Sequence, residues 1–111
     1  MQIPHDKRVR HYELTYLISP QLTSDETREI AAAVEKSIKK FDGSILSQED
    51  WGKRDLAYTL KHLSKRYDEA VFKHLVLEFE TKTAFEFEKD IHLNQQILRY
   101  LFVVAEETKK A

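Results

Sequence analysis

Residues 11–43 read HYELTYLISPQLTSDETREIAAAVEKSIKKFDG and hold one strand, one helix and the signals between them. Apolar and polar residues alternate over His11–Ile18, which is typical of a strand with one buried face. Ser19 and Pro20 follow directly, and a proline cannot continue a strand ladder. The stretch therefore opens with a strand that ends at Ile18.

A helix is predicted after this strand. Thr23 and Glu26 have the spacing of a capping box, in which each side chain binds a free backbone N–H group of the other residue. Apolar residues then recur at helical spacing, namely Ile30, Val34, Ile38 and Phe41. Glycine readily takes the left-handed conformation that ends many helices. We therefore expect a helix over Ser24–Phe41 that Gly43 terminates in that conformation.

The segment after Gly43 predicts two strands separated by a loop. The first begins near Ser44, is interrupted at Trp51-Gly52 as a β-bulge would interrupt it, and resumes up to Leu60. The polar stretch Lys61–Glu69 is expected to be a loop. Ala70–Glu80 alternates again and predicts a strand.

The remaining residues predict a short helix and a last strand. Thr83 and Glu86 repeat the capping-box spacing, so a helix is expected from there to about Leu93. Asn94 suits a left-handed turn after the helix. Ile97–Ala105 is apolar on both faces and predicts a strand.

The order β-α-β-β-α-β predicts an α+β fold of the ferredoxin-like type, a four-stranded antiparallel sheet with two helices on one face. The other face is then left for solvent, RNA or a partner protein. We expect residues 8–106 to form a single domain, with flexible termini at 1–7 and 107–111. Because the first and last strands are neighbours in this topology, we also expect Arg99 to pair with Glu13 on the open face.

Composition excludes several classes of site. The chain has 111 residues, enough for one domain, and no cysteine, so disulfides and thiolate metal sites are excluded and a reducing cytosol fits. No apolar run is long enough to span a membrane, and the polar Met1–Arg10 holds neither a secretory signal nor a transit peptide. The five histidines have no metal-ligand spacing, so no metal or cofactor is expected: His5, His11, His62, His74 and His92.

Charge is segregated along the chain although the net charge is only −1. Residues 1–12 and 51–74 are basic, whereas residues 75–107 are acidic. A local positive patch binds phosphate even when the net charge is near zero. The candidate RNA- or partner-binding residues are therefore the cations of the basic segments and one arginine of the last strand: Lys7, Arg8, Arg10, Lys53, Arg54, Lys61, Lys65, Arg66 and Arg99.

A plain structural role remains open for these positions. The basic arm before the first strand would also serve as a solubilising terminus, and Arg54 would also pair with a carboxylate inside the domain. Trp51 and Tyr58 are interpreted as packing residues, since large aromatic side chains usually fill cores or cover sheets. Tyr67 is the one loop aromatic that suits stacking on an unpaired base.

Four stretches together resemble the bacterial and organellar small-subunit ribosomal protein six family. The most specific is Trp51–Lys61, which reads WGKRDLAYTLK. The others are Arg10–Glu13 with Ile18–Leu22, the acidic helix Glu86–Ile91, and Leu93–Tyr100. They occur in the family's order and spacing and cover about Arg8 to Glu106. One departure is the absence of a glycine in Tyr67–Phe72, where the family usually has one before an aromatic residue.

The resemblance implies a non-enzymatic protein of the central platform of the small ribosomal subunit. It implies binding to 16S ribosomal RNA together with small-subunit ribosomal protein eighteen, and a role in subunit assembly and translation. No small-molecule substrate and no membrane are implied. The expected location is the cytoplasm, with an organellar ribosome as the alternative, although no transit peptide is seen.

Three other functions share the predicted fold. An acylphosphatase-like enzyme needs a loop of backbone N–H groups that cradles phosphate, and Ser19–Thr23 is no such loop. A small-molecule-sensing domain usually has a glycine at a strand–helix junction, which is missing here, and predicts a free dimer. An RNA-recognition-motif protein needs a basic-glycine-aromatic signature that Ala70–Glu80 lacks, and predicts tight binding to short single strands.

Overall fold

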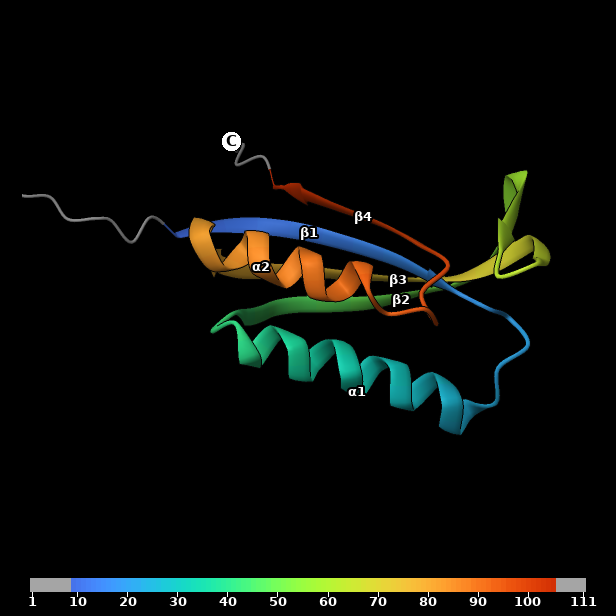
Figure 1. Cartoon of the computed structure of the whole chain (residues 1–111), viewed down its shortest axis with the longest axis horizontal. Coiled ribbons are helices and arrows are strands. Elements are labelled where there is room, and N and C mark those ends of the chain that lie inside the picture. The colour runs from blue at the N-terminus through green and yellow to red at the C-terminus, as the bar shows by residue number, and fades with distance from the viewer. Residues whose placement is uncertain (1–8, 106–111) are drawn as a thin grey trace, which may run out of the picture.

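The computed structural model describes residues 9–105. Its elements are β1 (Val9–Ile18), α1 (Ser24–Lys40), β2 (Ser44–His62), β3 (Lys65–Glu80), α2 (Thr81–His92) and β4 (Arg99–Val104). The strands form one antiparallel sheet in the order β2-β3-β1-β4, and both helices lie on the same face (Figure 1). The predicted ferredoxin-like α+β fold is confirmed. The ends of the expected domain, residues 8 and 106, lie outside the described residues.

The core lies between the helices and one face of the sheet. The predicted inward face of β1 is confirmed, because its alternate residues are buried: Tyr12, Leu14, Tyr16 and Ile18. Leu75, Leu77 and Phe79 of β3 face the same core. Aromatic rings fill its centre, where the Phe79 ring lies 4.7 Å from that of Phe87 between ring centroids. Neither helix of the described part is long and apolar enough to cross a membrane.

The start of α1 agrees with the sequence, and its end does so only in part. Thr23 Oγ1 accepts the Glu26 backbone N–H at 3.1 Å, and Glu26 Oε1 accepts the Thr23 N–H at 2.9 Å, so the capping box is confirmed. The left-handed residue, however, is Asp42, with φ 62°, and not Gly43. The predicted conformation of Gly43 is therefore wrong.

Gly43 is required for another reason. Its N–H donates to Ile38 O at 2.8 Å and that of Asp42 to Lys39 O at 3.0 Å, which together form a Schellman motif. A Cβ on Gly43 would lie 2.4 Å from Cε1 of the buried Phe79 ring. The close approach of the chain to the core excludes a side chain here.

The expected loop over residues 61–69 is wrong. β2 and β3 continue through it as one long hairpin, in which Lys61 is paired with Arg66 and His62 with Lys65. The turn is the dipeptide Leu63-Ser64, with φ values of 50° and 69°. Positive φ at both positions is the pattern of a type I′ turn, whose twist matches that of the flanking strands.

The boundaries of the last two elements also differ from the prediction. α2 begins at Thr81, and Thr83 forms no capping box, since its hydroxyl donates to Glu80 O at 3.2 Å. Asn94 is not left-handed, and its side-chain oxygen instead accepts the Gln96 N–H at 2.9 Å. β4 begins at Arg99 because the preceding residues are used by this turn.

Candidate nucleic-acid interface

The face of the sheet opposite the helices is open and carries a short apolar strip. Pairing places Gly52, Phe72, Leu17 and Arg99 in one row across the four strands. Leu17 is only 8% exposed although no helix covers this face. Its neighbours on the sheet therefore bury it, and the open face has some packing of its own.

A bulge in β2 shapes one edge of this face. The register with β3 skips one residue between Asp50 and Gly52, and Gly52 has φ 80°, so the predicted bulge at Trp51-Gly52 is confirmed. Asp50 accepts a hydrogen bond from the Lys73 ammonium at 2.8 Å and another from the Gly52 N–H at 2.9 Å. These two bonds, that of Lys73 first, hold the pKa of Asp50 below its ordinary value. Asp50 thus fastens the bulge to β3.

The bulge orients a column of stacked side chains. The Trp51 indole is parallel to the His74 imidazole, with ring centroids 4.4 Å apart. The Arg54 guanidinium lies 5.3 Å from the centroid of Trp51 and 5.7 Å from that of Phe72. Trp51 is therefore a packing residue on the sheet surface, as predicted. Arg54 forms no ion pair with a carboxylate within residues 9–105, so its charge is held by aromatic faces alone.

Six of the nine predicted site residues lie at one end of the molecule. Lys61, Lys65 and Arg66 are exposed on the hairpin that projects to the right in Figure 1. Lys53 and Arg54 precede that hairpin on β2, and Arg99 starts β4 opposite the end of β1. Lys53 lies 3.9 Å from Glu69, but both side chains are more than 40% exposed and such a pair holds them weakly. We call these six residues the cationic end.

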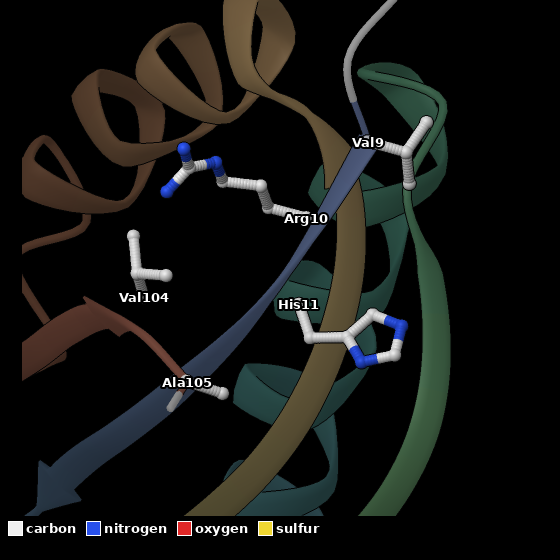
Figure 2. A pocket seen from close by; sticks show the side chains of 5 residues that line it. All are labelled: Val9, Arg10, His11, Val104 and Ala105. Carbon is white, nitrogen blue, oxygen red and sulfur yellow. The ribbon is translucent and has the colours of Figure 1, made fainter. Parts of the chain in front are cut away.

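Arg10 lies at the opposite end of the sheet. It is paired with Phe79, nearly the full length of β1 away from the hairpin. Figure 2 shows a hollow beside it, where the Arg10 and Val104 side chains lie on one side of β1 and those of Val9 and His11 on the other. The structure thus does not bring Arg10 to the other cations. Lys7 and Arg8 lie outside the described residues.

The expected pair between Arg99 and Glu13 is wrong. Pairing places Arg99 opposite Leu17 and Glu13 opposite Val103. Four residues along a strand correspond to about 13 Å, which is too far for an ion pair. The Glu13 carboxylate instead lies 3.8 Å from Nε2 of His74.

Two features of the cationic end were not predicted from the sequence. Between Asp55 and Leu60, four residues of β2 lie opposite the single residue Asp68, and Tyr58 in this segment is 84% exposed. The interpretation of Tyr58 as a packing residue is therefore wrong. His62 also bonds to Gln95 O at 2.7 Å and so ties the hairpin to the α2–β4 connection. No glycine or proline marks either feature in the sequence, so no turn or bulge signal indicated them.

Within residues 9–105, no group of three or more His, Asp or Glu side chains is arranged to hold a metal ion.

Comparisons with known proteins agree with one another. The model of the ribosomal protein S6 family matches residues 11–104. The chain is 29% identical over 102 residues to the small ribosomal subunit protein bS6 of Dictyoglomus turgidum, covering 89% of this chain and 98% of that one. It is 30% identical over 111 residues to the bS6 of Aquifex aeolicus, covering 96% of each. The crystal structure of 30S ribosomal protein S6 from Thermotoga maritima has the same fold, with a TM-score of 0.77, 22% identity and coverage of 88% and 89%.

Proposed function

The chain belongs to the ribosomal protein S6 family, and from that premise we propose that it is a non-catalytic structural protein of the small ribosomal subunit in the cytoplasm. In that role it binds 16S ribosomal RNA together with small-subunit ribosomal protein eighteen. Binding holds the RNA in one conformation and so supports assembly of the subunit. The residues that we assign to RNA are those of the cationic end.

The observation that carries this proposal is the gathering of six cations at one end of a protein whose net charge is −1. Phosphate contacts depend on local positive potential, and the acidic residues Glu86, Glu88 and Asp90 belong to α2, outside the hairpin that presents three of these cations. Arg54 is suited to phosphate because its guanidinium is held by stacking and its N–H groups remain available for a forked contact. Tyr58 adds an exposed ring beside them.

The remainder of the open face suits a protein partner better than RNA. Leu101 and Val103 of β4 are 60% and 42% exposed on this face. Apolar side chains of this kind gain little from phosphate, but they are buried favourably by another protein. Glu13 and Glu78 border this region and would attract a basic partner. We assign this surface to protein eighteen.

The two partners should strengthen each other's binding. A protein and an RNA that each favour the same arrangement of the other are coupled, and the coupling is reciprocal. Titration of a central-domain 16S fragment with this protein alone, with protein eighteen alone and with both tests this. We expect tighter binding by the pair. Equal affinity for the single protein and for the pair would contradict joint binding.

The cationic end is tested by changing Lys53 and Arg54 together to Ala. Affinity for the fragment should fall, and the slope of its logarithm against the logarithm of salt concentration should decrease by roughly 0.7–0.9 for each phosphate that is no longer neutralised. The matched control is Lys39 and Lys40 changed to Ala, which removes the same charge from the end of α1. If both pairs of substitutions weaken binding equally, only net charge matters and the assignment of the cationic end is wrong.

The ribosomal role itself is tested by fractionating a cell lysate on a sucrose gradient. The protein should travel with whole ribosomes and free small subunits, and all of it should move to the small-subunit fractions when low magnesium separates the ribosomes into subunits. A protein found only in the soluble fractions would contradict the proposal.

A further inference from the structure

A hollow lies beneath the tip of the β2–β3 hairpin, where three connections distant in sequence meet. One wall comes from the β1–α1 connection, one from the hairpin tip and one from the α2–β4 connection, all at the right-hand end in Figure 1. The bond between His62 and Gln95 O, at 2.7 Å, joins the second wall to the third. The hollow is thus formed by tertiary structure and not by a single loop.

The lining of this hollow has a distinctive chemistry. Three leucines form its apolar part: Leu22, Leu63 and Leu98. The other lining residues are an aromatic ring, hydrogen-bonding groups and one cation: Ser19, His62, Lys65, Tyr67, Gln95 and Gln96. No Asp or Glu lines it, although 19 of the 111 residues of the chain are acidic. The hollow therefore suits a flat, apolar ligand that has hydrogen-bonding edges and carries negative charge.

Resting on the function proposed above, we propose that this hollow binds one unpaired nucleotide of the RNA, with its base turned out of the stack. The base lies against Tyr67 and the leucines. Its edge meets the side-chain amides of Gln95 and Gln96, and its phosphate meets Lys65. A nucleotide combines all the properties that this lining selects, and bases turned out of a helix are commonly recognised by stacking and edge contacts.

The surroundings make an RNA nucleotide a better occupant than a peptide. The one charged side chain of the lining is the Lys65 cation, and no carboxylate of the lining lies beside it to repel a phosphate. A nucleotide would place its phosphate against that ammonium. A peptide would bring a backbone without charge, to which Lys65 contributes little. The side-chain amides of Gln95 and Gln96 make no hydrogen bond to other side chains within residues 9–105, so they remain available for a base edge.

The strain in the hairpin turn fits this use. Leu63 and Ser64 have positive φ, which costs about 1 kcal/mol or more for a residue other than glycine. An Asn-Gly dipeptide would remove most of that strain, but it would also remove the Leu63 side chain from the lining. Strained backbone is often retained where a side chain serves binding.

The experiment measures the affinity of the full-length protein and its variants for the central-domain 16S fragment over a range of salt concentrations. Tyr67→Ala should lower affinity roughly fivefold to a hundredfold, the range for one stacked base, without changing the salt slope. Tyr67→Phe should bind like the wild type. Gln96→Ala should cost roughly fivefold, and its matched control, Gln48→Ala at an exposed position of β2, should have no effect.

Because Tyr67 is half-buried and Tyr67→Ala could loosen the hairpin, the RNA is varied as well. Nucleotides that the protein protects from base-specific chemical modification are replaced one at a time by abasic residues. One abasic replacement should reproduce the loss of affinity, and Gln96→Ala should then cause no further loss, since both changes remove the same interaction. The proposal is overturned if no abasic replacement weakens binding, or if Gln96→Ala lowers affinity equally for the abasic and the intact RNA.

The Lys53 and Arg54 double variant separates this proposal from the function on which it rests. If that variant weakens RNA binding while the Tyr67 and Gln96 variants bind like the wild type, the hollow is not a nucleotide site but the RNA-binding function stands. If the wild type itself does not bind the fragment, alone or with protein eighteen, both are wrong.

Discussion

Substitution of Asp50 tests whether the bulge at Gly52 positions the side chains of the open face. Its carboxylate is the only link in the described structure between the bulge at Gly52 and the Lys73 side chain of β3. Trp51 lies within that bulge and Arg54 two residues after Gly52, so the bulge influences the positions of both. Asp50→Asn keeps the shape of the side chain and one acceptor oxygen, but removes the charge that Lys73 needs.

The expected loss of stability is modest. The Asp50 side chain is 60% exposed, which reduces the strength of the ion pair, whereas that of Lys73 is only 18% exposed and finds no equal replacement. Exposed ion pairs contribute up to about 1 kcal/mol, and a charged hydrogen bond somewhat more. We expect the free energy of unfolding at pH 7 to fall by about 1 kcal/mol, which lowers Tm by roughly 4 °C in a domain of this size.

The pH dependence identifies the cause of this loss. The hydrogen bond from Lys73, followed by that from Gly52, lowers the pKa of Asp50 from its ordinary value of 3.8. A lowered pKa means that the carboxylate stabilises the folded state above about pH 4, and that this contribution is lost as pH falls through the folded-state pKa. Urea denaturation at pH 7, 5, 4, 3 and 2 should show the wild type and Asp50→Asn converging below pH 4.

Asp55→Asn is the matched control, since it removes the same charge from the same strand, and Asp55 makes no such pair of bonds in the described part. Both substitutions remove a negative charge near the cationic end, so both should slightly favour RNA electrostatically. Asp50→Asn should nevertheless bind the 16S fragment more weakly than Asp55→Asn, because the bulge is loosened. A stability difference that persists unchanged to pH 2, or equal RNA affinity of the two variants, would refute the role given to Asp50.

Three further predictions concern the backbone and the core. Gly43→Ala should lower the free energy of unfolding by about 1–3 kcal/mol in urea denaturation, because its Cβ would collide with the buried Phe79 ring; an unchanged midpoint would contradict this. Leu63→Asn with Ser64→Gly should raise it by about 1 kcal/mol and slow hydrogen exchange at the hairpin tip, and faster exchange there would contradict a strained turn. Burial raises the pKa of Tyr16 to about 12, so the wild type should lose stability as pH rises from about 10 to 12 while Tyr16→Phe loses less; identical alkaline losses would contradict it.

The half of the fold that faces the helices could be predicted because one physical requirement governs it. Each element there buries one face against a common core, so burial imposes a period of two on β1 and of about 3.6 on α1. The capping box at Thr23 likewise depends on groups three residues apart, which the sequence shows directly. Where the physical requirement is local or periodic, the sequence is sufficient to predict the element.

The hairpin tip could not be predicted because pairing there is not accompanied by burial. Lys61 and Arg66 pair through their backbones beyond the core, so neither strand needs apolar residues to alternate. The turn Leu63-Ser64 also lacks the asparagine and glycine that usually mark a type I′ turn. A polar stretch of this kind is indistinguishable from a loop until its partner strand is known.

The arrangement of the candidate site residues in space also depends on strand pairing that the sequence does not show. Basic residues are grouped along the chain, and Lys53 and the hairpin cations do lie on the same two paired strands. Grouping along the chain did not place Arg10, which lies near the start of β1 at the far end of the sheet. The adjacency of the first and last strands likewise did not give the register, in which Arg99 is opposite Leu17 and not Glu13. Proximity along the chain becomes proximity in space only through the register of the strands, and one register step changes every neighbour.

The irregularities of β2 connect the stability of the fold with its proposed use. The pairings of β1 with β3 and β4 run without a shift, whereas β2 is shifted against β3 at three places. Each shift leaves backbone groups without ladder partners, and each holds one large side chain: Leu46, Trp51 and Tyr58. Leu46 and Tyr58 are exposed to solvent, whereas Trp51 stacks on His74. Bulges also protect an edge strand from pairing with a second molecule. Edge protection alone, however, would not require aromatic rings at two of the three shifts, nor Lys53, Arg54 and Lys61 between and beside them. Because the rings and the cations occupy the same strand, we infer that β2 gives up regular pairing in order to present them.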